Sequence, residues 1–425
     1  MADWPQTTVG ELCRIKHGFA FKGEHFVGDG DLMVLSPGNF LPGGGLQLRD
    51  GKETFYEGEF PPEFLLDEGD LLVAMTDLKQ DAPILGSTIR VPESGRYLHN
   101  QRLGLVTDIA EHIDSGFLYY LLNSDVVRSW LRATATGSTV RHTAPERIYA
   151  ADVRLPPLEE QVKIAASLEA LDHLIENNRR RIEIVEAMAR LIYREWFVHF
   201  RFPGHEDVEL VDSDLGPIPE GWDVQSVGDI VDTIGGGTPS KNKPEYWEDP
   251  SIVWYTPSDL TKQPAMFTFG SGDQINELGL SKSSAKLFPA RTVMMTSRAT
   301  IGAITIATTE ASTNQGFISC VPNERLSEYH LYFWLHDNVE LFLTFASGAT
   351  FKELRKSTFR DLPIAVPPIG LEGKFNEAVE SMCELIENLL RQNEVLAEAR
   401  NLLLPRLISG ELDVSDLDLD LEPVA

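Results

Sequence analysis

The chain contains 425 residues, of which 42% are hydrophobic and 24% are charged, so its composition is that of a folded protein rather than a disordered one. Acidic side chains outnumber basic ones by 65 to 37, and the formal net charge of -28 argues against a surface that is basic throughout. No apolar run approaches the roughly 18 residues of a membrane helix, and the N-terminus lacks a secretory signal, so we expect no membrane association and a cytoplasmic location. The distant cysteines Cys13, Cys320 and Cys383 fit a reducing compartment.

The sequence is a tandem duplication, because similar segments appear in the same order in both halves. The clearest pairs are Trp4 with Trp222, Met75-Thr76 with Met295-Thr296, Asn100-Gln101 with Asn314-Gln315, Gly137-Ser138-Thr139 with Gly348-Ala349-Thr350, and Leu174-Ile175-Glu176-Asn177 with Leu385-Ile386-Glu387-Asn388. The spacing between partners varies early in the repeat and is constant at its end. This indicates loop insertions followed by a rigid shared element.

Each copy begins with short apolar runs punctuated by glycine and proline, which is typical of strands and turns with a few helices. A long helix follows, and its diproline suits a helix entry. The predicted parts are 1–155, a first globular domain; 156–202, a central helical spacer; 203–221, a linker rich in proline, glycine and acids; 222–366, a second globular domain; 367–410, a C-terminal helical spacer; and 411–425, an acidic tail. We expect the tail to be disordered.

Both predicted long helices carry a heptad seam, in which apolar residues recur at alternating intervals of four and three. The first seam is Ile164, Leu168, Leu171, Ile175, Asn178, Ile182, Val185, Ala189, Ile192 and Trp196. The second seam is Phe375, Val379, Met382, Ile386, Leu389, Asn393, Leu396, Arg400, Leu403 and Leu407. Pro405 is expected to break or kink the second helix, and Gly410 to terminate it.

One interior seam position in each helix is an asparagine, which tests the direction of pairing. With the heptad windows fully overlapped and antiparallel, Asn178 faces Asn393 and the amides can hydrogen-bond. In a parallel pairing each amide faces an apolar residue, at a cost of roughly 1–3 kcal/mol. Antiparallel helices about 48 Å long would hold two globular domains apart, related by an approximate two-fold axis. The alternative is that both asparagines lie at partly wet positions and do not pair.

Four segments carry a resemblance to a known family: ProProLeuGluGluGln (156–161), ArgGluTrpPhe (194–197), GlyGlyGlyThrProSer (235–240) and LeuLeuLeuProArgLeuIleSerGlyGluLeu (402–412). In this order the chain resembles the specificity subunit of type I restriction-modification systems. The resemblance implies an α+β fold in which an antiparallel coiled coil separates two target-recognition domains, each reading half of a bipartite, asymmetric site on double-stranded DNA. It also implies that two methyltransferase subunits, and in some systems restriction subunits, dock on the chain. We expect Phe197, Phe200 and Phe202 to be part of an exposed docking surface on the helices.

Under this resemblance the chain would catalyse nothing itself. S-adenosylmethionine would be used by the methyltransferase subunits, and ATP and Mg²⁺ would be used where a restriction subunit is present. The residues agree, because no diproline is followed by an aromatic residue as an adenine methyltransferase motif requires, and the run Gly235-Gly236-Gly237 lacks phosphate-loop spacing. We therefore expect no catalytic residue, no cofactor and no metal site in this chain.

Basic residues concentrate in the stretches 128–147, 282–298 and 352–360. Arg141 aligns with Lys352 just after the repeated Gly-Ser-Thr and Gly-Ala-Thr turns, where basic and hydroxyl side chains suit phosphate contact and groove reading. The predicted DNA-binding residues are Arg128, Arg132, Arg141, Arg147, Lys282, Lys286, Ser297, Arg298, Lys352, Arg355, Lys356 and Arg360. The candidates for base reading are Arg298, Ser297, Lys286, Arg102 and Gln101. Because the Asn-Gln pairs recur in both halves, we expect them to have a structural role.

Two other classes of function stay open from the sequence. A duplicated coiled-coil adaptor would bind proteins without reading DNA, and the paired basic stretches count against it. A stand-alone nuclease or methyltransferase would need a catalytic constellation, which the sequence does not show.

Overall fold

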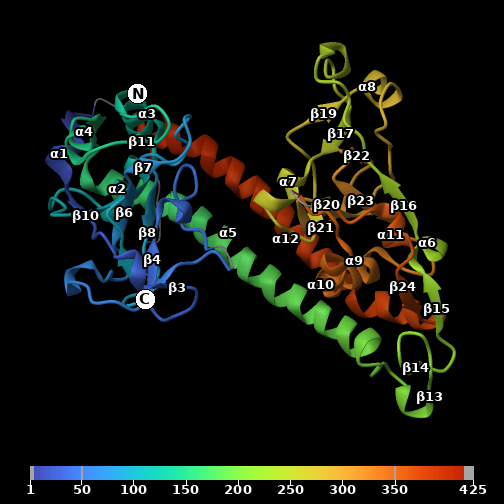
Figure 1. The fold of residues 1–425 in the computed structure, drawn as a ribbon. Helices are drawn as coiled ribbons and strands as arrows, with labels where there is room; N and C mark the ends of the chain where they lie inside the picture. Colours follow the sequence, from blue (N-terminus) through green and yellow to red (C-terminus); the bar gives the residue numbers. More distant parts are fainter. Residues whose placement is uncertain (1–3, 49–50, 349–350, 416–425) are drawn as a thin grey trace. The chain divides into compact units, whose positions relative to one another are not determined.

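The computed structural model describes residues 4–48, 51–348 and 351–415, so positions 416–425 of the predicted acidic tail lie outside the described residues. The chain divides into two units. Unit 1 consists of Met1–Ile175 and Val395–Ala425, and unit 2 consists of Glu176–Glu394. Both boundaries fall inside long helices, so α5 (Leu158–Tyr193) and α12 (Ile369–Ile408) each contribute to both units (Figure 1).

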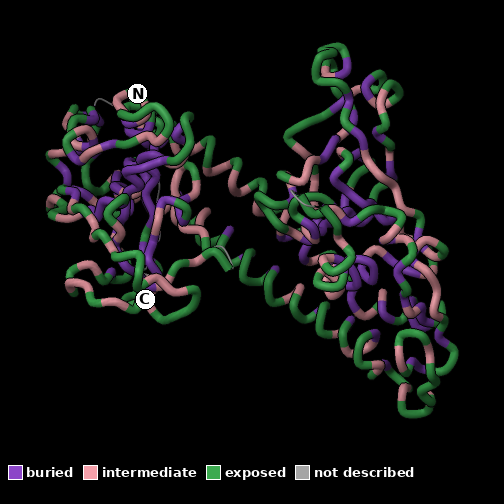
Figure 2. The backbone as a smooth tube through the Cα atoms, in the orientation of Figure 1, coloured by how far each residue is buried: buried purple, intermediate pink, exposed green. Residues whose placement is uncertain are grey.

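Unit 1 is built on two four-stranded sheets, with the strand orders β2-β10-β6-β8 and β3-β5-β4-β9. The first sheet is antiparallel and contains β2 (Arg14–His17), β6 (Leu71–Ala74), β8 (Thr88–Arg90) and β10 (Leu103–Thr107). The second is mixed and contains β3 (Phe26–Val27), β4 (Met33–Leu35), β5 (Phe55–Tyr56) and β9 (Tyr97–His99). The four residues of β6 are all buried, as in the purple centre of this unit in Figure 2, which explains its uninterrupted apolar sequence.

The remaining elements of unit 1 are short strands and helices around these sheets. They are β1 (Gln6–Thr8), α1 (Val9–Leu12), β7 (Thr76–Asp77), α2 (Ser115–Asn123), α3 (Asp125–Thr134), β11 (Arg141–His142), α4 (Pro145–Tyr149), β12 (Asp152–Arg154), and the 3₁₀ helices Gly23–His25, Pro37–Asn39 and Pro62–Phe64. Asp114 caps α2 by accepting a hydrogen bond from the N–H of Phe117 at 2.8 Å.

Unit 2 repeats the first sheet and extends it by one strand, in the order β16-β23-β20-β21-β18. Its first four strands follow the same order along the chain as β2-β10-β6-β8, so the duplication extends to topology. This sheet contains β16 (Asp232–Gly235), β18 (Phe267–Thr268), β20 (Val293–Arg298), β21 (Thr300–Ala307) and β23 (Phe317–Val321). A second sheet contains β17 (Ile252–Tyr255), β19 (Gln274–Ile275) and β22 (Ala311–Thr313).

The remaining elements of unit 2 are short strands and helices. They are β13 (Leu210–Val211), β14 (Ile218–Pro219), β15 (Asp223–Ser226), α6 (Val227–Ile230), α7 (Pro257–Lys262), α8 (Glu277–Ser281), α9 (Glu328–Asp337), α10 (Val339–Phe345), α11 (Lys356–Arg360), β24 (Pro363–Val366), the 3₁₀ helices His205–Asp207 and Pro244–Tyr246, and a π-helical turn at Arg194–Val198.

Both units close in the same way, through a strand pair that joins their two ends. In unit 1, β1 pairs antiparallel with β12, and in unit 2, β15 pairs antiparallel with β24. A one-turn helix follows the first strand of each pair, and a long helix follows the second. The repeated scaffold therefore includes the junction from which each long helix starts.

The segment predicted as a linker has a structure of its own. Its strands β13 and β14 form an antiparallel pair, and Ile218 is buried in the core of unit 2. Phe197, Phe200 and Phe202 were predicted to lie on an exposed docking surface, and this is wrong. Phe197 and Phe202 are buried, Phe200 is half-buried, and all three rings contact Trp222 at centroid distances of 5.3–6.1 Å. The chain turns back after α5, and this turn folds the rings inward.

The heptad seam predicts the buried faces of both long helices, since all of its residues are buried or half-buried. In unit 1, Ile164 and Leu168 share a core with Leu407. In unit 2, Ile182 and Ala189 share a core with Phe375 and other α12 residues. Pro405 was expected to break or kink the helix; the expected break is wrong, because α12 continues to Ile408. Proline costs about 3 kcal/mol inside a helix, but burying the side chains at 407 and 408 offsets this cost. Gly410 follows the helix end with a φ of 67°, as expected of a helix terminator.

The helices run antiparallel within each unit, and the two seam asparagines meet in unit 2. The amide nitrogen of Asn178 donates to the amide oxygen of Asn393 at 3.0 Å and lies 3.4 Å from that of Gln392. In unit 1, Arg400 donates to Asp172 at 2.8 Å, which follows the same antiparallel register. The Asn178 side chain is 6% exposed, so its amide has little access to water as an alternative partner.

We predict that Asn178→Leu destabilises the chain by about 1–3 kcal/mol, because it leaves the amide of Asn393 without its partner. Adding Asn393→Leu should recover part of this loss, since two leucines can pack across the seam. Urea unfolding of the two single variants and the double variant measures the coupling, with Asn177→Leu at an exposed position as the control. Strictly additive costs would show that the asparagines do not act as a pair.

We also predict that α12 contributes to the stability of unit 1 through its last turn. Leu407→Ala should cost about 2–5 kcal/mol, because this side chain is 2% exposed and its truncation leaves a cavity. Leu402→Ala lies five residues earlier and is the matched control, since Leu402 is 69% exposed. Equal losses in thermal unfolding would argue that the burial of Leu407 is unimportant.

Candidate nucleic-acid interface

Each unit carries a small closed loop at an equivalent place in the repeat, and these are called the 136–142 loop and the 347–353 loop. Two backbone hydrogen bonds of 2.9–3.0 Å join the first and last residues of each loop. Gly137 and Gly348 have φ values of 92° and 131°, and a Cβ on either would lie 2.0 or 2.1 Å from the carbonyl oxygen three residues later. Only glycine fits this turn, which explains why a glycine recurs at positions 137 and 348. Residues 349 and 350 lie outside the described residues.

In unit 2 the 347–353 loop lies against the turn between the neighbouring strands β20 and β21. Ala299 in this turn donates its N–H to the carbonyl of Lys352 at 2.9 Å. The guanidinium of Arg298 lies 3.6 Å from the carboxylate of Glu353. Arg298 in the hairpin and Lys352 in the loop therefore come from adjoining segments, and both side chains are exposed.

In unit 1 the 136–142 loop occupies the corresponding place beside β7, which follows the central strand β6. Arg141 pairs with Asp77 in the β11–β7 ladder, and Thr143 donates its N–H to the carbonyl of Met75 at 2.9 Å. The two predicted partners in the repeat, Arg141 and Lys352, thus occupy equivalent positions next to the centre of their sheets.

Three predicted arginines of unit 1 gather around the 136–142 loop. Arg141 donates to the carbonyl of Arg132 at 3.0 Å, and Arg147 donates to the hydroxyl of Thr136 at 3.3 Å. Arg132 also lies 3.8 Å from Asp125, in an exposed ion pair that contributes little to stability. All three arginines are half-buried, so their guanidinium groups are held in place while remaining accessible.

The remaining exposed residues of the predicted set belong to other surface segments. Arg355 and Lys356 lie at the start of α11, and Lys282 and Lys286 lie at and after the end of α8. Their exposure is compatible with phosphate contact, and their role stays a prediction.

Two residues of the predicted set point into the protein and are removed from it. Arg128 is 7% exposed and donates to the carbonyl of Pro83, and its burial lowers its pKa. Ser297 is 4% exposed inside β20. Side chains buried to this extent are not available to a phosphate or a base. Arg360 is half-buried and donates to the carbonyl of Gly228 at 2.6 Å, and its role stays a prediction.

A family model described as the type I restriction modification DNA specificity domain matches residues 1–187 and 219–394. The chain belongs to this family.

The chain is similar to several specificity subunits, and the similarity covers part of some of them and the whole of another. The MjaIX specificity subunit of Methanocaldococcus jannaschii is 34% identical over 203 residues, which are 47% of this chain and 46% of that protein. The HindI specificity subunit of Haemophilus influenzae is 25% identical over 97% of this chain and 100% of that protein. A crystal structure of the S subunit of a type I restriction-modification system from M. genitalium covers 96% of both chains with a TM-score of 0.57 and 15% identity, which shows a shared fold.

The recurring asparagines have the structural role that we expected of them. The side-chain oxygens of Asn100 and Asn314 accept the N–H two residues later, at 2.9 and 2.8 Å. A Cβ on Gly18 would lie 2.2 Å from the carbonyl oxygen of Asn100, and one on Gly236 would lie 2.0 Å from that of Asn314. Each unit of this family member therefore uses the same glycine–asparagine contact to fix a turn.

The environment of Gln315 differs from that of the two asparagines. The sequence did not predict this, because the Asn-Gln pair recurs in both halves and the recurrence suggested a structural role. Its side-chain oxygen accepts a hydrogen bond from the hydroxyl of Thr238 at 2.6 Å. The exposed side chain lines a hollow of about 330 Å³ together with Ser258, Thr261 and Arg298. The nearness of Gln315 to Arg298 follows from the pairing of β20 with β23, which the local sequence does not reveal.

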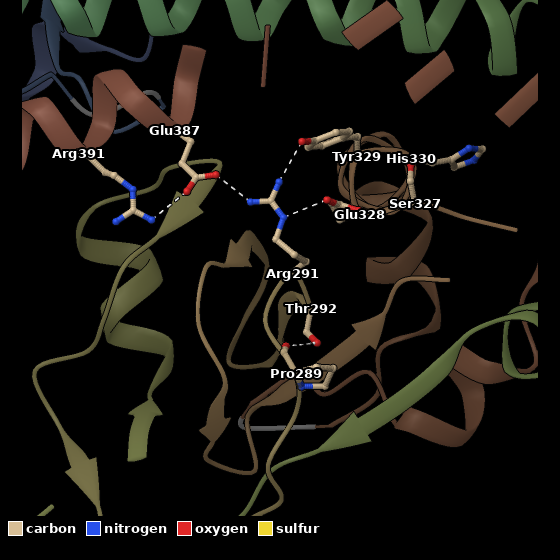
Figure 3. Close-up of polar contacts among 9 residues, drawn as sticks. All are labelled: Pro289, Arg291, Thr292, Ser327, Glu328, Tyr329, His330, Glu387 and Arg391. Atoms are coloured by element: carbon tan, nitrogen blue, oxygen red, sulfur yellow. Dashed lines mark hydrogen bonds and ion pairs between the residues drawn. The ribbon is translucent and has the colours of Figure 1, made fainter. Parts of the chain in front are cut away.

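Arg291 lies in the second basic stretch but is part of an internal ion cluster (Figure 3). Its guanidinium contacts Glu328 at 3.0 Å, Glu387 at 2.8 Å and the hydroxyl of Tyr329 at 2.9 Å. Burial alone would lower the pKa of Arg291, but the hydrogen bonds to Glu387 and Glu328 raise it above its usual value. This arginine attaches α12 to the sheet of unit 2, so we assign it a structural role.

Within residues 4–48, 51–348 and 351–415, no group of three or more histidine, cysteine, aspartate or glutamate side chains is arranged to hold a metal ion. No helix in that part of the chain has the length and apolarity needed to cross a membrane.

Proposed function

We propose that this chain recognises DNA sequence on behalf of a type I restriction-modification complex and does not catalyse methylation or cleavage itself. The observation that carries the proposal is the glycine-fixed loop that each unit places beside its central strands, with Arg141 in one unit and Lys352 in the other. A repeated scaffold with basic residues at the same place suits two recognition modules on one duplex. Phosphate contacts from these residues would set position, while unlike neighbouring loops would read unlike half-sites. The site would therefore be bipartite and asymmetric.

The long helices would also provide the docking surface for two methyltransferase subunits. On the unit 2 part of α5, Ile184, Met188 and Leu191 lie on one helical face and are 49–61% exposed. On the unit 1 part of α12, Val395 and Leu402 are 65% and 69% exposed and lie two turns apart. These apolar side chains take the role that the sequence suggested for Phe197 and its neighbours. Restriction subunits would join through the assembled complex.

The chemistry of such a complex would belong to its other subunits. S-adenosylmethionine would bind to the methyltransferase subunits, and ATP and Mg²⁺ would bind where a restriction subunit is present. The described cysteines are all free and buried, which suits the reducing cytoplasm in which we place the complex.

Mapping of methylated adenines tests this proposal most directly. The chain is produced with its methyltransferase subunit in a bacterium that lacks other adenine methylation, and the genome is sequenced for modified bases. We expect one motif with two specified parts separated by unspecified positions, and no such motif when the chain is omitted. Methylation that does not depend on this chain, or no DNA binding in any complex, would favour the protein adaptor instead.

We predict that the double variant Arg141→Glu/Lys352→Glu abolishes DNA binding by the complex at moderate salt while the chain stays folded. Each substitution replaces a phosphate-binding cation by an anion, and lost phosphate contacts should also flatten the dependence of affinity on salt. The control Arg96→Glu/Lys374→Glu makes the same change in charge at exposed positions outside the two loops. Fluorescence anisotropy at several salt concentrations measures both effects. Unchanged affinity would remove Arg141 and Lys352 from the interface.

A further inference from the structure

The hollow beside the β20–β21 turn has a largely apolar lining into which a few polar side chains are set. It has a volume of about 330 Å³, and Ser258 and Thr261 of α7 form one side. The start of α7 is fixed by Thr256, whose N–H and hydroxyl both contact the carboxylate of Asp259 at 2.7–2.8 Å. The wall of the hollow therefore does not depend on a flexible loop.

Arg298 projects from a turn that is held on both sides. The preceding residue, Ser297, donates its N–H to the carbonyl of Gly316 at 2.8 Å, and the following residue, Ala299, donates to that of Lys352 at 2.9 Å. Ala299 has a φ of 63°, which is uncommon for a residue other than glycine and costs on the order of 1 kcal/mol. The side chain of Arg298 is 48% exposed, and its guanidinium makes a long ion pair of 3.6 Å with Glu353.

Gln315 presents a donor to the same hollow. Its side-chain oxygen accepts a hydrogen bond from the hydroxyl of Thr238 at 2.6 Å. In this arrangement the NH₂ group is available as a donor. Arg298 lies at the end of β20, and Gln315 lies in the turn just before the neighbouring strand β23, so both can offer hydrogen-bond donors at one edge of the sheet.

We propose that this hollow is the place where unit 2 reads a guanine in the major groove, with Arg298 and Gln315 as specificity-determining residues. The inference rests on the proposed function, because it assumes that unit 2 meets duplex DNA. Guanine is the base that presents two acceptors, N7 and O6, on its major-groove edge, and a guanidinium can bind both at once. Adenine presents one acceptor beside a donor, and cytosine presents a donor, so neither offers the guanidinium of Arg298 two acceptors at once.

Unit 1 does not contain this arrangement, which is what two different half-sites require. Its strands β7 and β8 are joined by residues 78–87, whereas β20 and β21 are joined by Ala299 alone. Leu78, at the start of that longer connection, is 63% exposed. The shared scaffold therefore ends in a short turn in one unit and a long loop in the other, so the guanine preference applies to unit 2.

The test compares Arg298→Ala, Arg298→Lys and Gln315→Met in the complete complex with its methyltransferase subunits. Adenine-methylation maps and competition binding with duplexes that carry each base at each motif position are the measurements. We expect Arg298→Ala and Arg298→Lys to lose discrimination at one guanine position by roughly 10- to 100-fold and to leave the other half-site unchanged. Gln315→Met should relax the same position or the adjacent one. Lysine keeps the charge but lacks the planar fork, so it should not restore the preference.

Arg201→Ala is the matched control, because it removes another exposed arginine of unit 2 that pairs with a carboxylate, Glu195. A uniform loss of affinity across sequences, or full rescue by Arg298→Lys, would show that Arg298 contacts a phosphate and would overturn the inference. Loss of discrimination at a base other than guanine would also overturn it. If the unaltered complex produced no bipartite motif, the proposed function itself would fail, and this outcome is distinct from the others. Thermal unfolding of each variant confirms that it folds.

Discussion

Burial of the seam along α5 and α12 is the constraint on which the rest of the structure depends. Neither helix belongs to one unit alone, since Ile164 and Leu168 enter the core of unit 1 and Ile182 and Ala189 enter that of unit 2. The end of α12 supplies Leu407 to the core of the unit that begins the chain. Unit 1 is therefore assembled from both ends of the sequence. A change in the register of the two helices would move apolar residues out of both cores at once, so the seam fixes helix pairing and domain cores together.

The duplication preserves those parts of each unit that define the backbone and changes the parts that face outward. The preserved parts are the closing strand pair, the four-stranded order, the glycine–asparagine contact and the glycine-fixed loop. At the glycines of the last two features, backbone packs on backbone. A Cβ added there would lie 2.0–2.2 Å from a carbonyl oxygen, so substitution would distort the fold. The connection after the central strand differs completely between the units. A recognition module that reads different sequences with the same architecture needs a constant scaffold and variable connecting loops.

The sequence was sufficient to predict features that depend on periodicity and repetition. The heptad pattern predicted the buried faces of both helices, and the matching positions of Asn178 and Asn393 predicted that they meet. The sequence was not sufficient to predict whether a single side chain faces solvent or the protein interior. Arg128 and Arg291 lie in basic stretches, but the fold turns one toward a buried carbonyl and the other toward two glutamates. Charge counted along the chain cannot separate an arginine that faces solvent from one that satisfies a buried group. Pro405 shows the converse, because local propensity predicted a break that the burial of the following residues overrides.

The strong negative charge of the chain is consistent with a function in DNA recognition when the location of the basic residues is considered. An acidic surface repels the phosphate backbone wherever it does not carry a local excess of arginine and lysine, so nonspecific encounters are weakened over most of the molecule. In the proposed function, the basic residues at the 136–142 and 347–353 loops would provide local attraction to DNA at places that the scaffold duplicates. Hydrogen bonds to base edges can determine which DNA sequence is bound only when attraction to the phosphate backbone does not dominate the affinity. A chain with a net charge of -28 and small basic loops meets that condition better than a uniformly basic one would.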